Sequence, residues 1–268
     1  MRIFQVDAFT DAAFTGNPAA VCLLEQPADA RWMQQLAAEM NLAETAFVQP
    51  RQAGYLLRWF TPVVEVALCG HATLASAHVL YETGVAPACQ PITFESASGP
   101  LAARQDGGEI VLDFPATPAS QEAPPPGLLD ALGITTPVWT GSATEDFLVV
   151  VATEDEVLGM RPDPARLMTA GIRGTIVTAP ASRPGADFVS RFFAPAVGIP
   201  EDPVTGSAHC TLAPYWCERL GRTGLTGYQA SPRGGTVRVQ VAADRIMLGG
   251  RAVTVLAGEL AAAALPPS

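Results

Sequence analysis

Lysine is absent from this sequence, and all 16 basic residues are arginines. A pyridoxal Schiff base, a lysine-dependent aldolase and the usual phosphate-binding P-loop each need a lysine side chain. The sequence therefore excludes these three kinds of chemistry. The formal net charge is −10, and no stretch clusters the arginines into a basic stripe. Both observations argue against a nucleic-acid partner.

Cysteine and histidine are scarce, with 5 and 3 residues respectively. They are Cys22, Cys69, Cys89, Cys210, Cys217, His71, His78 and His209. No C-x-x-C or H-E-x-x-H spacing occurs, so the pattern predicts neither a disulfide framework nor a metal centre. A G-x-G-x-x-G loop for a dinucleotide is also missing. We therefore expect a protein that needs no cofactor and works with side chains and backbone groups alone.

Long hydrophobic runs are missing too. No apolar stretch approaches the ~20 residues that cross a bilayer, and the N-terminus MRIFQVDAFT lacks the pattern of a signal peptide. A content of 49% hydrophobic and 16% charged residues is typical of a compact globular protein. These features predict a cytoplasmic protein with no membrane partner.

Two stretches of the sequence repeat one another. RWFTPVVEVALCGHATLASA begins at Arg58, and RFFAPAVGIPEDPVTGSAHCTLA begins at Arg191. Both read arginine, aromatic, phenylalanine, small residue and proline, and both continue through a loop to a glycine and a run of small residues. A repeat at a spacing near half the chain length favours duplication of a domain over a short solenoid repeat.

The proline-rich segment PATPASQEAPPPG (115–127) separates the two copies and is typical of a linker. We therefore expect an N-terminal domain over residues 1–115, completed by a C-terminal strand near 252–268. The C-terminal domain is expected over residues 116–251.

Short apolar runs typical of strands recur in both halves, such as IFQVD, AAVCLL, TAFVQ, FLVVVA, TIVTA and FVSRFF. Many short strands with few long helices favour the α+β class. Three helices are predicted, in ADARWMQQLAAEM, in GHATLASAHVLYETG from about Gly70, and in TGSAHCTLAPYWCERLG, where Pro214 is expected to introduce a kink. Asn41 can close the first. The second is small or apolar all round, which predicts a helix buried on every side within a curled sheet.

The starts of the second and third helices are candidate anion-binding sites. The first N–H groups of a helix have no partner within it, carry a partial positive charge, and are easily approached where glycine leads. Gly70 with His71, and Gly206 with Ser207, are expected to clamp an anionic substrate between the two halves. Ordinary capping, by Thr205 or Ser207, is the alternative at the third helix.

Carboxylates near these helix starts are candidates for proton transfer. Glu44 in NLAETAFV enters an apolar strand, and acid–base chemistry suits it if it faces a desolvated cleft. A solvated residue at a strand end is the alternative. Asp202 is the natural second carboxylate, while Glu201 is expected to point into solvent. His71 either donates a hydrogen bond or relays protons, or is a buried structural histidine.

Two further residues have open roles. Cys69 precedes the second helix, where the helix start is expected to acidify its thiol, so it is a candidate racemase base. The alternative is a small buried apolar residue. Asn17 in FTGNPAAV is either a turn residue before Pro18 or a residue that lines the cleft.

Four of these motifs together resemble the PhzF family of phenazine-biosynthesis-like isomerases: DAFTDAAFTGNPAAVCLL, NLAETAFV, RWFTPVVEVALCGHATLASA and EDPVTGSAHCTLAPYW. They run in family order from residue 5 to about residue 235. The resemblance implies an α+β, diaminopimelate-epimerase-like fold. Two pseudo-symmetric domains would each curl a mixed sheet around a central helix, with the site in the cleft.

The resemblance also implies an activity. In the characterised family isomerase a glutamate moves a proton between carbons of a dihydro-hydroxyanthranilate without cofactor or metal. Its counterpart here is Glu44, and the other motif residues fall on His71, Asp202 and Ser207. The expected function is therefore a cofactor-independent isomerase of a small carboxylate-bearing metabolite, with Gly70, Gly206, Thr205, Asn17 and Cys69 at the substrate. A homodimer is implied as well.

Two other functions stay open. LCGHA is similar to the M-C-G-N-G stretch of diaminopimelate epimerases, so an amino-acid racemase or epimerase that uses Cys69 is one alternative. The second cysteine of those enzymes has no counterpart in DPVTG. A protein that binds a small ligand without catalysis is the other alternative.

Overall fold

The computed structural model describes residues 1–88 and 90–266, so Cys89 and residues 267–268 of the predicted C-terminal strand lie outside the described part. Contacts divide the chain into two compact units. The first comprises Met1–Asp113 and Gly249–Ser268, and the second comprises Phe114–Leu248.

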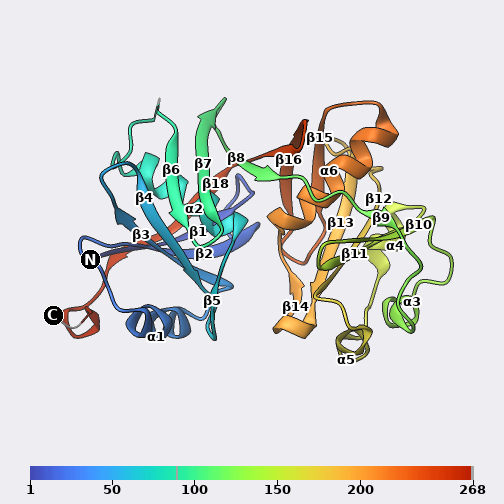
Figure 1. Ribbon diagram of the computed structural model, residues 1–268, viewed down its shortest axis with the longest axis horizontal. Helices are drawn as coiled ribbons and strands as arrows, with labels where there is room; N and C mark the ends of the chain where they lie inside the picture. The colour runs from blue at the N-terminus through green and yellow to red at the C-terminus, as the bar shows by residue number, and fades with distance from the viewer. Residues whose placement is uncertain (89, 267–268) are drawn as a thin grey trace. The chain divides into compact units, whose positions relative to one another are not determined.

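The first unit is a mixed sheet with two α-helices (Figure 1). Its elements are β1 (Arg2–Ala8), β2 (Asn17–Leu23), α1 (Ala30–Met40), β3 (Glu44–Pro50), β4 (Tyr55–Phe60), β5 (Glu65–Val66), α2 (Gly70–Glu82), β6 (Ile92–Ser96), β7 (Gly99–Asp106), β8 (Glu109–Pro115), β18 (Ala252–Glu259) and the 3-10 turn η3 (Ala262–Ala264). Strand β1 pairs antiparallel with both β18 and β2. From β2 the sheet continues through β3, β4, β6, β7 and β8, and the pairs β2–β3 and β4–β6 are parallel.

The second unit begins at the proline-rich segment. Its elements are β9 (Ser120–Gln121), α3 (Leu128–Leu132), β10 (Trp139–Ala143), β11 (Asp146–Val150), α4 (Glu154–Gly159), α5 (Pro164–Leu167), η1 (Met168–Ala170), β12 (Gly174–Pro180), β13 (Phe188–Ala194), η2 (Pro195–Val197), β14 (Ile199–Asp202), α6 (Gly206–Leu220), β15 (Gly224–Gln229), β16 (Gly235–Ala242) and β17 (Arg245–Gly250). The sheet runs β10, β11, β12, β13, β15 and β16, and the pairs β11–β12 and β13–β15 are parallel.

The two sheets therefore repeat one pattern of pairing. Along β1, β2, β3, β4, β6 and β7 the pairs alternate antiparallel, parallel, antiparallel, parallel, antiparallel. The series β10, β11, β12, β13, β15 and β16 shows the same alternation. The duplication predicted from the Arg58 and Arg191 motifs is thus present in the topology, and both arginines lie on equivalent strands, β4 and β13.

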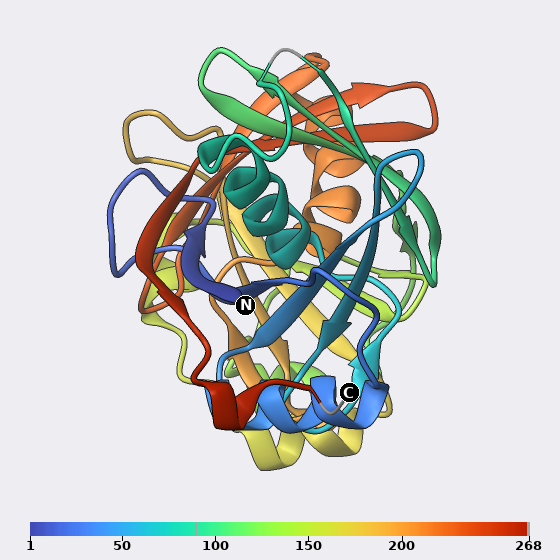
Figure 2. The same cartoon turned by 90° about the vertical axis from the view of Figure 1, so that its left-hand side faces the viewer.

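Helix α2 is buried on all sides, as its composition predicts. Every residue from His71 to Ala77 and from Val79 to Tyr81 is buried. The helix contacts β1, β2, β3, β7 and β18, and Figure 2 shows it inside the curled strands of the first unit. A helix without a polar face can lie only where apolar side chains surround it.

The opposite face of the first sheet is covered by α1. The Asp29 carboxylate accepts from the N–H of Arg31 at its start, and Asn41 ends it in the left-handed conformation with φ 49°, as predicted for Asn41. Its apolar residues pack with Phe47 and Phe60. Because successive side chains of a strand alternate, the neighbours of Phe47 and Phe60 point toward α2 instead.

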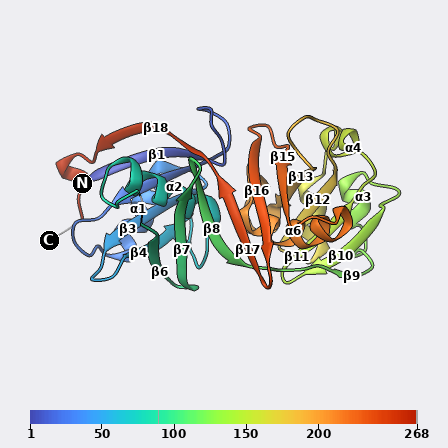
Figure 3. The same ribbon diagram turned by 90° about the horizontal axis from the view of Figure 1, so that it is seen from above.

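The second unit follows the same plan (Figure 3). Helix α6 packs on one face of the sheet, where Phe188 stacks on Trp216 and the Trp216 indole N–H donates to the Thr178 hydroxyl. The short helices α3, α4 and α5 pack on the other face, against Val189 and Phe193. None of the helices within residues 1–88 and 90–266 has the length and apolar character needed to cross a membrane.

Candidate active site

Glu44 lies at the start of β3, on the face of the sheet that α2 covers. It is the parallel partner of Ala19 in β2 and is two residues from Ala46, which pairs with Trp59 across β4. Phe47 and Phe60 point to the α1 side, so Glu44, Ala46 and Trp59 point to the α2 side. Glu44 as a whole is only 8% exposed, which excludes the alternative of a solvated residue at a strand end.

Glu44 contacts His71, the second residue of α2. The Glu44 Oε2 and His71 Nε2 atoms are 3.0 Å apart. The ring N–H does not point along this line, and Oε2 has no aligned hydrogen bond. The two side chains are therefore in close, buried contact. An acceptor without an aligned donor is free to take a proton from a third group.

The other ring nitrogen of His71 faces Asn17 and Cys69. Nδ1 is 3.1 Å from the Asn17 amide nitrogen and 3.5 Å from the Cys69 sulfur. Asn17 is not a turn residue: it begins β2 and is fully buried. An amide can donate to Nδ1 with its NH₂ group, or accept from a protonated Nδ1 with its oxygen after a half-turn. Asn17 can therefore serve either protonation state of the ring.

Opposing effects act on the pKa of His71. Burial lowers it, but the Cys69 sulfur and the Glu44 carboxylate raise it more, and the result is a pKa well above the ordinary value. Both neighbours therefore favour the charged form of the ring over its neutral form.

The expectation that the helix start acidifies Cys69 is wrong. Burial, and next to it the negative charge of Glu44, raise the pKa of this thiol, although His71 and the Ala72 N–H oppose them. Desolvation of a thiolate outweighs the partial charge of the helix end. Cys69 is thus a thiol at neutral pH, which disfavours it as a racemase base.

The start of α2 adds backbone donors beside these side chains. The first hydrogen bond within the helix runs from the Thr73 N–H to the Cys69 carbonyl. The N–H groups of Gly70 and His71 precede it, while that of Ala72 acts on the Cys69 sulfur. Unpaired N–H groups at a helix start stabilise a negative charge. The first unit therefore brings Asn17, Glu44, Cys69, Gly70 and His71 together.

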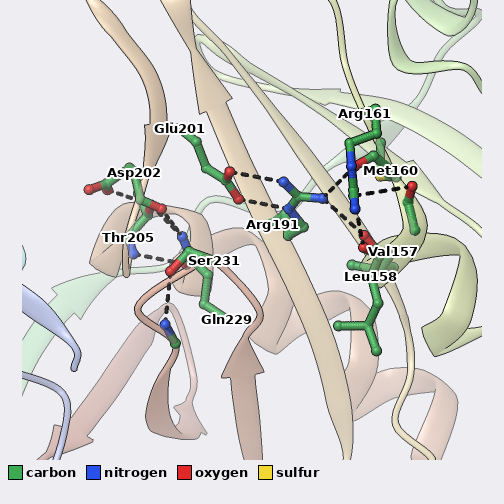
Figure 4. Close-up of polar contacts among 12 residues, drawn as sticks. Val157, Leu158, Met160, Arg161, Arg191, Glu201, Asp202, Thr205, Gln229 and Ser231 are labelled. Carbon is green, nitrogen blue, oxygen red and sulfur yellow. Dashed lines mark hydrogen bonds and ion pairs between the residues drawn. The ribbon is translucent and has the colours of Figure 1, made fainter.

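The second unit brings Asp202, Thr205, Gly206 and Ser207 together at the start of α6. The Thr205 hydroxyl donates to the Asp202 carboxylate, and the Thr205 N–H donates to the Gln229 side-chain oxygen. The Gln229 NH₂ in turn donates to the Asp202 carbonyl at 2.7 Å (Figure 4). The loop before α6 is thereby held rigid from β15.

Capping of α6 by Thr205 or Ser207, the alternative to an anion site, is not observed. Thr205 is the residue before the helix but makes no side-chain cap hydrogen bond, because its hydroxyl is engaged by Asp202. Ser207 is the second residue of the helix and is exposed. The N–H groups at this helix start are therefore left to other partners.

Glu201 does not point into solvent, contrary to expectation. Its two carboxylate oxygens accept from Nε and Nη2 of Arg191 at 2.7 and 2.9 Å, on the opposite side of β14 from the Asp202 group (Figure 4). The Arg191 Nη1 also donates to the Met160 carbonyl at 3.0 Å. The duplication has kept this pair, because Arg58 and Glu65 form the same two bonds in the first unit.

Strand β3 and its duplicate β12 differ in the residue at which they begin. Thr45 pairs with Phe60 as Thr175 pairs with Phe193, so Gly174 stands in the second unit where Glu44 stands in the first. A Cβ at Gly174 would lie 2.4 Å from the Phe192 ring, so no larger residue fits. Only the first unit carries a carboxylate at this strand start.

Sequence reasoning missed two polar side chains at these sites. Gln229 is fully buried and is the last residue of β15. This strand was not predicted, because its two glycines interrupt the apolar pattern of a strand. Trp59 is 1% exposed, and its indole N–H has no partner in the described chain although it lies on the Glu44 face. The equivalent residue in the second unit, Phe192, has no such donor. This difference between RWF and RFF is the signal that was available.

The histidine of α6 gives a testable pH dependence. His209 donates from Nδ1 to the Thr205 carbonyl at 2.8 Å. Burial lowers its pKa from 6.5 to about 4, although the Thr205 carbonyl opposes this. The unfolded chain takes up this proton at a higher pH than the folded chain, so the histidine costs no stability above pH 6.5, and stability falls as the pH falls toward 4.

We therefore expect the free energy of unfolding to drop by about 2 kcal/mol more in the wild type than in His209→Leu between pH 7 and pH 5. Urea unfolding of both proteins at the two pH values measures the difference. An identical pH dependence of the two would show that His209 is protonated in the folded protein.

Within residues 1–88 and 90–266, one group of side chains brings three types of metal ligand close together. Ligand atoms of Glu44, Cys69 and His71 all lie within 4.8 Å of one another. A thiolate, an imidazole and a carboxylate are the ligand types that zinc takes. No spacing in the sequence indicates such a site, because strand β3 and helix α2 meet only in the folded unit.

Comparisons with known proteins agree with this architecture. An uncharacterized isomerase of Halalkalibacterium halodurans is 51% identical over 259 residues, which cover 96% of this chain and 97% of the relative. The crystal structure of a PhzF-family phenazine biosynthesis protein from Enterococcus faecalis superposes with a TM-score of 0.92 at 42% identity and covers 97% of this chain and 98% of the other. A probable proline racemase from Agrobacterium radiobacter shares the fold alone, with a TM-score of 0.61 at 12% identity and coverage of 97% and 93%.

The fold is therefore the α+β, diaminopimelate-epimerase-like fold that the motifs imply, with a mixed sheet around a helix in each half. The sequence model of the family described as "Phenazine biosynthesis-like protein" (PhzC-PhzF) matches residues 6–258. With its duplicated sheets and a buried carboxylate that contacts the start of a central helix, the chain belongs to the PhzF family of phenazine-biosynthesis-like isomerases.

Proposed function

We propose that the protein is a cofactor-independent isomerase that moves a proton between carbon atoms of a small carboxylate-bearing metabolite. The observation that carries this proposal is the buried contact of 3.0 Å between Glu44 and His71 at the start of α2. Family membership supports the class of reaction, since the relatives of this chain are named isomerases.

Glu44 removes the proton in this proposal. Its Oε2 is buried without an aligned donor, so a lone pair is available to a substrate C–H bond. The imidazole of His71 lies 3.0 Å from this oxygen, and its own pKa is raised. Glu44 then returns the proton to a second carbon, which a single base can do when the intermediate stays bound.

The backbone stabilises the intermediate. Removing a proton next to a conjugated carboxylate builds negative charge on oxygen, and fixed N–H donors lower the energy of that charge. The N–H groups at the start of α2 supply such donors, and we propose that Gly206 and Ser207 at the start of α6 are substrate-binding residues as well. Asp202, held by Thr205, orients a polar group of the substrate. We further propose that the protein works as a homodimer.

Exchange of solvent deuterium tests the reaction and identifies the substrate in one experiment. The protein is incubated in D₂O with pools of small carboxylic acids, and mass spectrometry detects acids that gain deuterium or change retention time. We expect at least one carbon-bound deuterium to enter a pool member in the presence of protein and none in its absence. A protein that binds acids and exchanges no proton would instead be the non-catalytic binding protein.

A further inference from the structure

The indole N–H of Trp59 is a buried donor without an acceptor. The residue is 1% exposed, and its Nε1 atom has no hydrogen-bond partner among the described residues. By contrast, the indole N–H of Trp32 donates to the Ala264 carbonyl at 3.0 Å. That of Trp216 donates to the Thr178 hydroxyl at 3.0 Å. A buried donor that stays unpaired costs free energy of folding, so a native protein keeps one only where something else compensates it.

Trp59 and Glu44 are neighbours on the α2 side of the first sheet. Trp59 pairs with Ala46 across β3 and β4, so Glu44 is its diagonal neighbour on the same face, within reach of an aromatic side chain. The second unit shows how far a ring extends from this position. Phe192 is the counterpart of Trp59, and its ring lies 2.4 Å from the place that a Cβ of Gly174 would take. Gly174 is the counterpart of Glu44, so the ring at this position extends toward the start of the neighbouring strand.

The carboxylate and the indole do not pair with one another. Glu44 Oε2 is an acceptor without an aligned donor, and Trp59 Nε1 is a donor without an acceptor. Both atoms are therefore left to a third group on this face of the sheet. In the proposed reaction, Oε2 takes a proton from a C–H bond of the substrate. An N–H group needs an oxygen or nitrogen acceptor instead, and the same substrate molecule can supply it.

The differences between the two units link the donor to the base. Where the first unit has Glu44 and Trp59, the second has Gly174 and Phe192. The second unit therefore lacks both the carboxylate and the indole N–H at one diagonal pair of positions. The arginine and the phenylalanine on either side of Trp59 are the same in RWF and RFF, so this strand changes only on the face toward the central helix.

We propose that Trp59 is a catalytic residue whose indole N–H donates to the substrate oxygen that gains negative charge as Glu44 removes the proton. When the C–H bond breaks, its proton passes to Glu44 Oε2, and its electron pair moves onto that oxygen. The indole keeps its own proton and stabilises the charge, as a donor fixed in advance does. This role rests on the proposed isomerase function.

A donor at this position restricts the class of substrate. The carbon that loses its proton has to be attached to, or conjugated with, a carboxylate or carbonyl group, because only then does the charge reach an oxygen. A molecule with an ammonium group or a hydrocarbon at that point would leave the indole without an acceptor. Sites built to make a buried hydrogen bond reject such analogues strongly.

Nuclear magnetic resonance of the protein with ¹⁵N-labelled indoles tests the hydrogen bond without turnover. Sodium benzoate is the probe, because it is a conjugated carboxylate with no acidic C–H bond for Glu44. The signal of Trp59 is assigned by its loss in Trp59→Phe. Saturating benzoate should move the proton signal of this N–H downfield, while the signals of Trp32 and Trp216 stay in place. A Trp59 signal that neither benzoate nor any acid of the exchange screen moves would show that the indole binds buried water only, and would overturn the proposal.

The Trp59→Phe variant also tests the catalytic role. Deuterium exchange into the substrate found in the screen should fall by about 100-fold or more, mainly through kcat, as loss of one such donor causes. Phenylalanine suits the position, since Phe192 occupies its counterpart in the second unit. Trp32→Phe is the matched control, because it removes an indole N–H that donates to Ala264. This control should exchange at the wild-type rate.

A second variant separates hydrogen bonding from size. Benzothienylalanine at position 59 keeps the shape of the indole and has sulfur in place of the N–H group. It should lose as much exchange as Trp59→Phe, and exchange at the wild-type rate would contradict the role of the N–H. Circular dichroism identifies any variant that fails to fold. A wild type that exchanges no acid would overturn the isomerase function and with it the catalytic role, while the benzoate titration still decides whether Trp59 binds the ligand.

Discussion

Replacing Glu44 by glutamine should reduce deuterium exchange into the substrate by about 10²–10⁴-fold, the usual contribution of a general base. Glutamine keeps the size and shape of the side chain but has no basic oxygen for a carbon-bound proton. The substrate identified in the exchange screen serves as probe, and mass spectrometry measures the rate in both proteins. Substrate affinity should change little, since the amide can still face His71.

Glu39→Gln is the control for the change of charge. Glu39 is exposed on α1, and its loss should leave exchange at the wild-type rate. Exchange by Glu44→Gln at the wild-type rate would exclude Glu44 as the base. Cys69→Ser distinguishes the racemase alternative: it should keep most of the exchange activity, because the raised pKa of the thiol leaves little thiolate to act.

The Glu201→Gln substitution should destabilise the protein by about 3 kcal/mol, as removal of one partner from a buried ion pair does. The side chains of Arg191 and Glu201 are 10% and 18% exposed. The variant keeps the hydrogen-bonding shape of the side chain but leaves the Arg191 charge in the protein without compensation. Urea unfolding at pH 7 measures the effect.

The duplicated pair provides the control for this second prediction. Arg58 and Glu65 make the same two hydrogen bonds, and each arginine lies over the ring two residues along its strand, Phe60 or Phe193. The side chains of Arg58 and Glu65 are 26% and 38% exposed, so water compensates the charges. Glu65→Gln should therefore cost less than about 1 kcal/mol. Equal losses in the two variants would contradict the role assigned to burial.

Much of the fold could be predicted from local patterns. The runs IFQVD, AAVCLL, TAFVQ, FLVVVA, TIVTA and FVSRFF all coincide with strands, except that AAVCLL and FLVVVA extend one and two residues past the strand end. The three long helices lie where predicted. Strands β6, β7, β14 and β15 were missed, as were the two-residue strands β5 and β9. GLTGYQ in β15 contains two glycines, and β6 is a short segment of mixed polarity. Both are parallel neighbours of a strand far along the chain, and such pairing leaves little trace in local sequence.

The candidate site was predictable in its residue types more than in its contacts. Glu44, His71 and Asp202 were identified from motifs, and Asn17 and Cys69 were named with their roles open. Two predictions were wrong: that the Cys69 thiol is acidified and that Glu201 points into solvent. Each depends on how much water surrounds the group. Gln229 and the Trp59 indole were missed, since neither residue type marks a site unless its burial is known.

The sequence by itself determined the duplication, the buried central helices and the chemical groups available to each half. These features are encoded locally, in repeated motifs, in the spacing of apolar residues and in the absence of lysine. Only the tertiary structure decided that Glu44 meets His71 at 3.0 Å, that Cys69 stays a thiol, and that one of two equivalent ion pairs is buried. The physical reason is that proton affinity and ion-pair strength depend on distance and desolvation, which arise from packing between segments far apart in the chain.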